Sequence, residues 1–424
     1  MKYDIIIIGG GASGLCTAIM SKTEKNKILI IEHNDRVGKK ILSTGNGKCN
    51  LTNLHAKVEM TCCGSQEKEG AFVQNPEGIK PYVSSSDDSF AKTVLSGFNA
   101  DSAIRFFSEL GMVPLNKNGY IYPRSEQAAS VLDLFRFACE EKGVEILCGY
   151  QPMSVEKTAK GFLIDGEYLC DRLVIATGGM NASKTGSDGS GYEIAKRFGH
   201  HLVPPVPALC ALKCSDPFFK ELAGVRTDAE LTLYRLSGRK GETKSREELL
   251  TVSGNLQFNS YGISGIPVFQ LSLLASRLLK NGEEILVKIN LLPELSEEEL
   301  VAILKNKKEH KLLGILNKKL AHVIEKESYK AHPNEREEEY PYVFTHMIQR
   351  FKVHPTSTVS FEEAQTTLGG ISVEEIDPLT MESRLVKGLY FTGEILDVSG
   401  ICGGYNLQWA WASAYAASCG LTRA

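Results

Sequence analysis

The chain has 424 residues and a nearly balanced charge, with 48 Lys and Arg against 51 Asp and Glu and a formal net charge of −3. This balance, without a basic stripe, argues against nucleic acid as the main partner. The hydrophobic content of 42% is ordinary for a soluble globular protein, and the length allows two or three domains. No apolar run approaches the roughly 18 residues of a membrane span, so we expect no membrane partner.

The N-terminal residues and the cysteines indicate a cytoplasmic protein. The first strand pattern begins within a few residues of Met1, which leaves no room for a signal peptide. The 11 cysteines form no Cys-x-x-Cys pair and show no metal-ligand spacing. We therefore expect buried free thiols, no metal site and a small-molecule substrate, with the oligomeric state left open.

The N-terminal residues carry a dinucleotide-binding pattern. Residues 4–8 and 28–31 predict two buried parallel strands, and the second ends at Glu32, which can accept hydrogen bonds from ribose hydroxyls. Between them, a Gly-x-Gly-x-x-Gly spacing allows a tight turn, close approach of a pyrophosphate and packing of the following helix, whose N–H groups point at the phosphates. The residues expected at the cofactor here are Gly9, Gly11, Ala12, Ser13 and Gly14.

The loop after Glu32 favours FAD over NAD. An NAD domain would continue into a regular crossover helix, whereas residues 33–53 are a basic stretch followed by small and amide residues. The basic residues suit phosphates, and the Gly/Asn-rich part suits close backbone approach and amide hydrogen bonds to an isoalloxazine. A solvated surface loop is the alternative. The expected cofactor residues are His33, Arg36, Lys39, Lys40, Gly45, Asn46, Cys49, Asn50 and Thr52.

Two later strand ends and a C-terminal helix fit the same cofactor, bound without a covalent link. Residues 173–176 and 389–391 predict strands that end in small-residue turns, and two glycines open an apolar helix that runs to about Cys419. Such a helix N-terminus places positive dipole where reduced flavin is negative. A strand–loop junction or a buried helix is the ordinary alternative for each. The expected cofactor residues are Thr177, Gly178, Gly179, Gly393, Glu394, Asp397, Gly403, Gly404, Tyr405, Asn406 and Leu407.

The chain resembles the two-dinucleotide-fold flavoproteins, and within them the aminoacetone oxidase/BaiN-like family of bacterial NAD(P)/FAD-dependent oxidoreductases. The segments that carry the resemblance are residues 9–14, 38–53, 176–179, 261–265, 367–371, 381–383, 393–397 and 403–410. Lys48 and Asn46 stand where the family usually has Arg and Gly. Pro152 stands at the usual adenine-contact position, although proline has no N–H to donate.

The pattern and the resemblance together predict an α/β fold with a discontinuous domain. We expect a Rossmann-like FAD-binding domain of the glutathione-reductase type over residues 1–200 and 356–424. Residues 201–355 are expected to form an inserted substrate or cap domain, β-rich and barrel-like over 201–292 and helical over 296–350. Ligand sites favour domain interfaces, so we expect the active site between the insert and the flavin.

The resemblance implies two different chemistries. BaiN-like members reduce enone double bonds of steroid-type substrates, and the aminoacetone oxidase branch oxidises small amines with oxygen. We expect NAD(P)H-driven reduction of an enone C=C bond by hydride from flavin N5, with a steroid or bile-acid-type substrate and with NAD(P)H as a transient donor. The alternatives are a flavin oxidase of a small amine such as aminoacetone, and a non-catalytic FAD-binding regulator or an RNA-modification scaffold, although the near-neutral charge weighs against RNA. No catalytic residue is assigned; Tyr405 and Cys49 are the titratable groups expected nearest the flavin.

Overall fold

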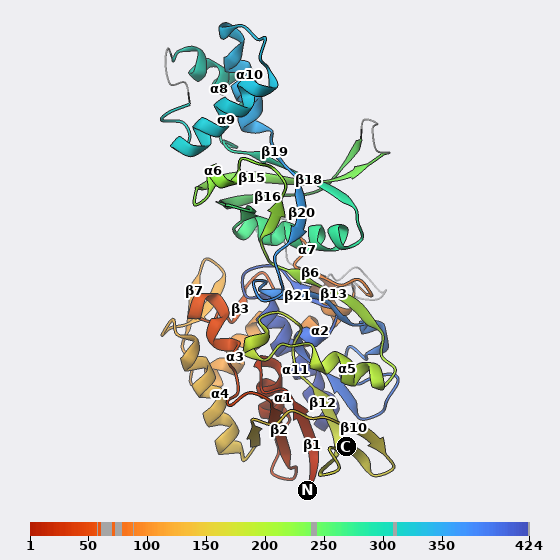
Figure 1. Cartoon of the computed structure of the whole chain (residues 1–424). Helices are drawn as coiled ribbons and strands as arrows, with labels where there is room; N and C mark the ends of the chain where they lie inside the picture. The colour runs from red at the N-terminus through yellow and green to blue at the C-terminus, as the bar shows by residue number, and fades with distance from the viewer. Residues whose placement is uncertain are drawn as a thin grey trace, which may run out of the picture. The chain divides into compact units, whose positions relative to one another are not determined.

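The computed structural model describes residues 1–56, 58–60, 70–72, 79–87, 89–238, 244–307 and 312–422. The chain divides into two compact units (Figure 1). Unit 1 comprises Met1–Pro205 and Gln365–Ala424, and unit 2 comprises Val206–Ala364. Unit 2 therefore starts a few residues after the start of the insert predicted over 201–355, and it also ends a few residues after the end of that insert.

Unit 1 is built on a mainly parallel sheet of order β10-β11-β12-β1-β2-β9, with β22 paired to β12. Strands β1, β2, β9, β12 and β22 run parallel, and β10 and β11 add an antiparallel hairpin at one edge. The isoleucines at 5–8 and 28–31 are buried because both faces of such a sheet are covered. The strands are β1 (Lys2–Ile8), β2 (Ile28–Glu32), β9 (Glu145–Cys148), β10 (Val155–Thr158), β11 (Gly161–Ile164), β12 (Tyr168–Ile175) and β22 (Leu389–Phe391).

Helices α1 (Ala12–Ser21) and α11 (Tyr405–Thr422) pack against each other beside this sheet (Figure 1). Helix α11 is apolar on nearly every face, as expected of a helix in the interior. Its two indoles are buried and each donates a hydrogen bond: Trp409 Nε1 to Gly393 O at 3.0 Å and Trp411 Nε1 to Leu51 O at 2.8 Å. The last helix therefore connects segments from both ends of the chain.

Short elements complete unit 1. Three small sheets have the orders β3-β8-β7, β23-β6 and β4-β5, and β13 pairs with β21. The strands are β3 (Thr52–Asn53), β4 (Val58–Met60), β5 (Gly70–Phe72), β6 (Tyr82–Val83), β7 (Pro114–Lys117), β8 (Tyr120–Pro123), β21 (Thr366–Ile371), β23 (Ser399–Gly400) and β13 (Leu202–Ala208), which continues from unit 1 into the first residues of unit 2. The helices are α2 (Phe90–Gly97), α3 (Ala100–Glu109), α4 (Ala128–Lys142) and α5 (Ser190–Arg197).

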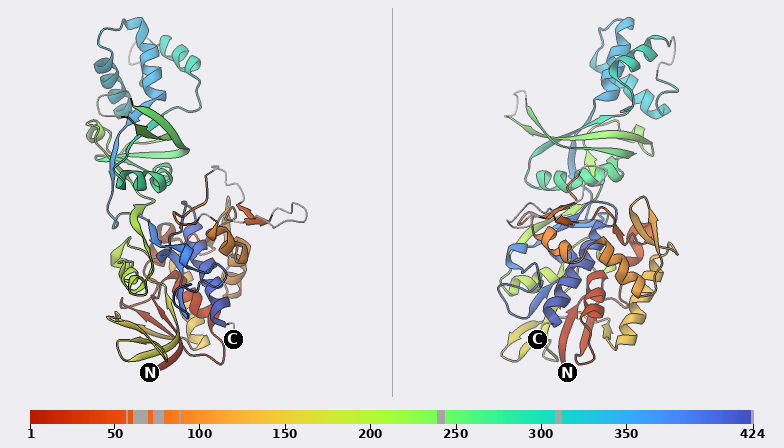
Figure 2. Two further views of the ribbon diagram at one scale, coloured as in Figure 1. Left: turned by 90° about the vertical axis from the view of Figure 1, so that its right-hand side faces the viewer. Right: turned by 180° about the vertical axis from the view of Figure 1, so that it is seen from behind.

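Unit 2 contains an antiparallel sheet of order β19-β18-β15-β16-β17-β14-β20 together with helices (Figure 2). Its last two strands follow the helices α8–α10, so the helical part predicted over 296–350 lies between strands of one sheet. The strands are β14 (Leu212–Cys214), β15 (Arg226–Ser237), β16 (Ser245–Asn259), β17 (Gly262–Ser264), β18 (Glu284–Asn290), β19 (Phe351–Val353) and β20 (Pro355–Thr358). The helices are α6 (Phe219–Leu222), α7 (Ile266–Lys280), α8 (Glu297–Lys305), α9 (Lys318–Ala331) and α10 (Tyr340–Gln349).

Helix α7 lies inside the part of the insert for which the sequence pattern predicted strands. Most of its residues are buried, so it has no polar face that would give a helical period. Gly265 precedes the helix, Pro267 lies in its first turn, and Arg277 and Lys280 lie in its last turn. These start and stop signals were present in the sequence and would have identified the helix.

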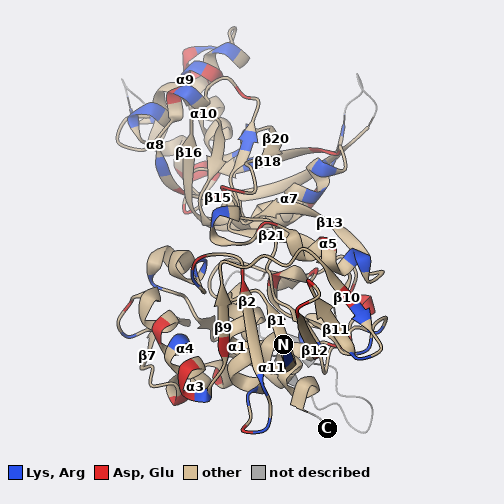
Figure 3. Cartoon of the chain, turned by 60° about the horizontal axis from the view of Figure 1, so that its bottom comes forward, with Lys and Arg blue, Asp and Glu red and all other residues tan. Residues whose placement is uncertain are grey.

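Charged residues are mixed over both units. Figure 3 shows Lys and Arg interspersed with Asp and Glu. Across the described ranges, no helix has the length and apolar character needed to cross a membrane.

Candidate functional site

The glycine turn after β1 leaves one open position. A Cβ at Gly9, whose φ is +108°, would overlap the carbonyl oxygen of Ala176, and a Cβ at Gly14 would overlap the carbonyl oxygen of Gly9. A Cβ at Gly11 would meet no atom of the described residues within 4 Å. Gly9 and Gly14 therefore serve close packing inside the protein, whereas the space beside Gly11, at the start of α1, is free for a ligand.

Glu32, at the end of β2, is 7% exposed and already accepts hydrogen bonds. Its Oε2 accepts from Gly10 N at 2.9 Å, and its Oε1 accepts from Asn34 N and Nδ2 at 2.8 Å each. A Cβ at Gly186 would lie 3.7 Å from Oε1 and 3.5 Å from His33 Cε1. The carboxylate is thus fixed in place, and each oxygen can accept more than one hydrogen bond.

The basic residues expected at the phosphates have different surroundings. Lys39 Nζ lies 2.7 Å from Asp35 Oδ1 and donates to Asn34 Oδ1 at 3.1 Å. Arg36 is exposed. Lys40 Nζ lies 2.7 Å from Glu394 Oε2. Both lysine amino groups are therefore paired with carboxylates of the protein itself.

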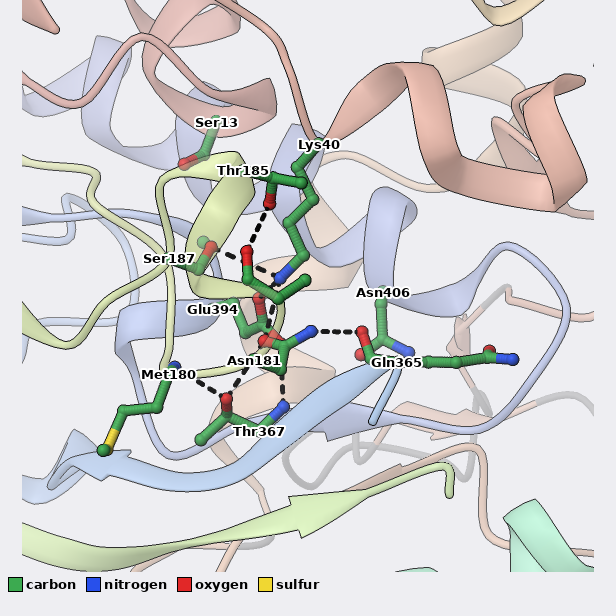
Figure 4. A network of polar contacts seen from close by, with 12 residues as sticks. Ser13, Lys40, Met180, Asn181, Thr185, Ser187, Gln365, Thr367, Glu394 and Asn406 are labelled. Atoms are coloured by element: carbon green, nitrogen blue, oxygen red, sulfur yellow. Dashed lines mark hydrogen bonds and ion pairs between the residues drawn. The ribbon is translucent and has the colours of Figure 1, made fainter. Parts of the chain in front are cut away.

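Lys40 and Glu394 belong to a polar network inside unit 1 (Figure 4). Lys40 Nζ also donates to Asn181 Oδ1 at 2.8 Å and to Ser187 Oγ at 3.4 Å. Glu394 Oε1 accepts from Thr367 N at 2.8 Å. The side chains of Lys40 and Glu394 are 26% and 20% exposed, so this ion pair is largely shielded from solvent.

Thr367 and Ser187 lie so close to the turn after β12 that its two residues Gly178 and Gly179 have no room for a side chain. Thr367 Oγ1 donates to Asn181 Oδ1 at 3.1 Å and accepts from Met180 N at 2.8 Å. A Cβ at Gly179 would overlap Thr367 Oγ1, and a Cβ at Gly178 would lie 2.7 Å from Ser187 Oγ. Asn181, Ser187 and Thr367 were not among the residues expected from the sequence. Asn181 and Ser187 lie beside glycine-rich segments, and Thr367 begins segment 367–371, which carries the family resemblance.

The ends of β12 and β22 meet the start of α1. Thr392 N donates to Ile175 O at 3.1 Å, and Ser13 Oγ donates to Thr392 O at 3.3 Å. A Cβ at Gly393 would lie 2.5 Å from Ser13 Oγ. In the described part of the chain, the buried Oγ1 of Thr177 has no hydrogen-bond partner. The strand ends therefore converge on the helix that follows the glycine turn.

In the loop after β2, the residues in the left-handed region include Gly45, Asn46 and Cys49, with φ of 56°, 54° and 56°. Gly45 and Asn46 are exposed, whereas Cys49 is completely buried, and its N–H donates to Thr44 O at 3.0 Å. Burial raises the pKa of the Cys49 thiol to about 12. Cys49 is therefore a protonated packing residue at neutral pH rather than a thiolate nucleophile.

The start of α11 is joined to the loop after β2. Gly403 and Gly404 have φ of +108° and +97°. A Cβ at Gly404 would lie 2.8 Å from the carbonyl group of Thr52 and 2.9 Å from Asn50 Oδ1. Thr52 Oγ1 donates to Gln408 Oε1 at 2.7 Å. Asn50 is 8% exposed, and its Oδ1 has no hydrogen-bond partner among the residues that the structure describes.

The next residues of α11 form hydrogen bonds with the loop that precedes the helix and with β6. Tyr405 is 2% exposed, and its carbonyl oxygen accepts from Tyr82 OH at 3.0 Å. The Asn406 side chain accepts from Gly400 N and donates to Gly400 O, both at 2.9 Å. Leu407 is half-buried. Tyr405 and Asn406 are thus held by the protein, so burial disfavours the Tyr405 hydroxyl as a group that reaches a substrate.

Asp397 is fully buried and organises a serine turn. Its Oδ2 accepts from Ser85 N at 2.7 Å, from Ser86 N at 3.1 Å and from the hydroxyls of Ser84 and Ser86 at 3.3 and 3.2 Å. β6 pairs with β23 just beside it. The sequence placed Asp397 at the cofactor, whereas the structure also gives this carboxylate the task of holding residues 84–86.

The loop after β9 lies beside the end of β2. Tyr150 N donates to Glu32 O at 3.1 Å, and Gly149 N donates to Asn34 O at 2.7 Å. Pro152 follows two residues later and is half-buried. The position predicted for the adenine contact is therefore connected to Glu32 through the backbone of this loop.

The family model described as HI0933-like protein Rossmann domain matches residues 3–420. The chain belongs to this family. The 3-dehydro-bile acid delta(4,6)-reductase of Clostridium scindens is 38% identical to this HI0933-like chain over an alignment of 427 positions, gaps included, which covers 97% of each protein. A ribosomal RNA dihydrouridine synthase of Escherichia coli is 30% identical over 435 residues, 98% of this chain and 97% of the relative. The resemblance to BaiN-like flavoproteins is confirmed.

Solved structures with low sequence identity include two steroid enzymes. The 3-ketosteroid delta1-dehydrogenase of Sterolibacterium denitrificans has a TM-score of 0.49 at 11% identity, with 99% of each chain covered. The 3-ketosteroid-delta4-(5alpha)-dehydrogenase of Rhodococcus jostii has a TM-score of 0.43 at 12% identity, with 99% of this chain and 96% of that chain covered. Similarity at this level says nothing about a shared substrate.

The residues of this HI0933-like protein fit FAD. Unit 1 contains the open space beside Gly11, the two glycines before α11, and the oxygens of Thr177 and Asn50 that have no hydrogen-bond partner among the described residues. Gly11 and Thr177 follow the carboxyl ends of β1 and β12. Dinucleotides bind at the carboxyl ends of strands in such sheets. The chain is an FAD-dependent oxidoreductase with a Rossmann-type FAD-binding domain. Within the described ranges, no cluster of three or more His, Cys, Asp or Glu residues could hold a metal ion.

Proposed function

We propose that this protein reduces a C=C bond conjugated to a carbonyl group, with non-covalent FAD as the cofactor and NAD(P)H as a transient donor. The observation that carries the proposal is the 38% identity, over 97% of both chains, to a reductase named for a 3-dehydro-bile acid. The dihydrouridine synthases support the same reaction type, because dihydrouridine is uridine with two hydrogens added across a C=C bond conjugated to a carbonyl.

Several residues of unit 1 are suited to hold the cofactor. Glu32 accepts from the adenosine ribose, and Gly11 with the first N–H groups of α1 receives the pyrophosphate. The start of α11, behind Gly403 and Gly404, would hold the pyrimidine end of the flavin. Its dipole stabilises negative charge there. When bound and reduced, FAD supplies the hydride for the β-carbon of the substrate.

The Lys40–Glu394 pair keeps the inner site electrically neutral. Glu394 is largely shielded from solvent, and a lone carboxylate there would repel the phosphates of the cofactor. Lys40 compensates this charge and, through Asn181 and Ser187, fixes the turns after β12. The role of Lys40 is therefore to position the cofactor site and to balance its charge.

A small lipophilic enone, of the steroid or bile-acid type, fits the chain better than ribosomal RNA as the substrate. The formal net charge of −3 gives no electrostatic attraction for a phosphate backbone. The nine cysteines in the described residues are all free, which suits a reducing cytoplasm where NAD(P)H is available.

Anaerobic half-reactions test the proposal. The purified protein should be yellow, and acid precipitation should release FAD into the supernatant. NADH or NADPH should bleach the flavin, and a 3-oxo-Δ4 steroid should restore its colour without oxygen. Bleaching by aminoacetone with reoxidation by oxygen alone would instead indicate an amine oxidase. A flavin that no donor reduces would indicate a regulator, and reoxidation by a uridine-containing rRNA fragment but not by steroid enones would indicate an RNA substrate.

A further inference from the structure

A tyrosine outside the cofactor motif lies against the start of α11. Gly403 has so little space on one side that a Cβ there would lie 2.6 Å from Tyr120 Cε1 and 3.3 Å from its Cδ1. Cε1 is the ring atom next to the carbon that carries the hydroxyl group. The hydroxyl end of Tyr120 is therefore close to Gly403.

Tyr120 is held there by a small sheet rather than by a loose loop. It begins β8 and pairs with Asn53 of β3, whose Nδ2 donates to Gly403 O at 3.1 Å. Leu54 N donates to Gly119 O at 2.9 Å, which fixes the turn before β8. The position of the Tyr120 ring relative to the start of α11 is thus set by backbone pairing and by one side-chain hydrogen bond.

The alternation along β8 turns this ring away from the core. Ile121 and Pro123 are buried, whereas Tyr120 and Tyr122 are only half-buried and share the other face of the strand. The two groups that the sequence singled out, Cys49 and Tyr405, are 0% and 2% exposed. Tyr120 is therefore better placed than either of them to reach a substrate beside the flavin.

We propose that Tyr120 is the catalytic acid that protonates the α-carbon of the enone; this rests on the proposed function. The enone gains a hydride at its β-carbon from reduced FAD and a proton at its α-carbon from the Tyr120 hydroxyl. Two C–H bonds form as the C=C π bond breaks. The Tyr120 phenolate then takes a proton from water, and NAD(P)H supplies the two electrons.

The variant Tyr120→Phe removes the hydroxyl and keeps the ring against Gly403. Tyr168→Phe is the matched control, because Tyr168 begins β12 and lies about 20 Å along the strand from its carboxyl end. Both holoproteins are reduced photochemically without oxygen and mixed with a 3-oxo-Δ4 steroid. Flavin reoxidation should slow by about 100- to 10,000-fold in Tyr120→Phe, the usual effect of losing a general acid, and should stay unchanged in the control.

Two further measurements separate proton donation from packing. FAD content and the steroid affinity of the oxidised holoprotein, read from the shift of the flavin spectrum, should match the wild type in Tyr120→Phe. The wild-type reoxidation rate should fall at alkaline pH, where a tyrosine hydroxyl loses its proton, and this decline should be absent in the variant.

Three results would overturn the assignment of Tyr120. They are a Tyr120→Phe rate within threefold of wild type, a loss of steroid affinity as large as the loss of rate, and an unchanged pH dependence in the variant. A wild-type protein whose reduced flavin no enone reoxidises would overturn the proposed function itself, and the assignment of Tyr120 with it.

Discussion

Lys40 Nζ lies 2.7 Å from Glu394 Oε2, although 354 positions separate the two residues in the sequence. The contact joins the loop after β2 to the turn after β22. Neither residue had a partner that could be read from the sequence, which assigned both of them directly to the cofactor. The structure shows that the two charges first satisfy each other.

Replacing Lys40 by Met should lower the free energy of unfolding of the apoprotein by about 1–3 kcal/mol. Removing one partner of a buried pair costs about 3–5 kcal/mol, and the 20–26% exposure of these side chains reduces this figure. Urea unfolding followed by circular dichroism measures the change. Lys39→Met is the control: its partner Asp35 is 77% exposed, so stability should change by less than about 1 kcal/mol.

The double variant Lys40→Met/Glu394→Gln distinguishes the ion pair from packing. If the cost comes from the unpaired carboxylate, the second substitution should recover most of the lost stability. A double variant as unstable as Lys40→Met alone would contradict the role given to the pair.

Gly11→Ala should leave the stability of the apoprotein unchanged, whereas Gly14→Ala should lower it. A Cβ at Gly11 meets nothing within 4 Å, so the apoprotein should keep its melting temperature but lose FAD affinity, because the methyl group takes the space of the pyrophosphate. A Cβ at Gly14 overlaps the carbonyl oxygen of Gly9, so this variant should lose stability even without FAD. Thermal unfolding of both apoproteins, together with FAD titration, checks the pair. Normal FAD affinity in Gly11→Ala would show that the pyrophosphate lies elsewhere.

Glu32→Gln should weaken FAD binding by about tenfold to a hundredfold. The physical reason is the loss of charge-assisted hydrogen bonds to the ribose, each contributing about 1.5–3 kcal/mol. Gln keeps an acceptor for Gly10 N, so the turn after β1 should stay folded, unlike in Glu32→Ala. Asp35→Asn is the control, since Asp35 is an exposed partner of Lys39. Equilibrium dialysis gives the affinity, and equal retention of FAD by all three proteins would refute the assignment.

The pKa values of two adjacent histidines should be shifted in opposite directions from the ordinary value. Burial lowers the pKa of His200, whose ring nitrogens lie 3.0 Å from Glu375 Oε2 and 2.8 Å from Ser383 Oγ. The hydrogen bond to Glu375 raises the pKa of the exposed His201. NMR titration of histidine-labelled protein should therefore show that His201 is protonated before His200 as pH falls. Glu375→Gln should lower the pKa of His201. Protonation of His200 before His201 would contradict this.

The contributions of the two histidines to the stability of the fold also depend on pH in opposite ways. The folded pKa of His200 lies below its unfolded value of about 6.5, so its contribution is present above that pH and is lost as pH falls through the folded pKa. The folded pKa of His201 lies above the unfolded value, so its contribution is present below about pH 6.5 and is lost as pH rises through the folded pKa.

The sequence predicted the features that depend on short stretches of chain. The strands on either side of the Gly-x-Gly-x-x-Gly turn, and the position of Glu32, follow from apolar runs and local spacing. The overall α/β class followed from the same signals, and it is confirmed. The apolar helix that opens after Gly404 was also predicted, because its glycine start is a local signal.

The sequence could not predict the features that depend on distant partners. Nothing near Lys40 indicates Glu394, and nothing near Asp397 indicates the serine turn at 84–86. Tyr120 had no motif, and only the pairing of β3 with β8 brings it beside Gly403. Helix α7 was missed for another reason: burial on most of its sides removes the periodicity by which helices are recognised.

The indole of Trp411 that donates to Leu51 O bears on how the protein is made. Unit 1 places α11, formed by residues 405–422, against elements from the first part of the chain, so its packing stays incomplete while a ribosome is still adding those residues. Unit 2 is contiguous in sequence and is synthesised whole before then. Domains fold as units during synthesis. On the proposed placement of the start of α11 at the flavin, capture of FAD is a late event in biogenesis, because the glycine turn cannot retain the cofactor before the last helix is in place.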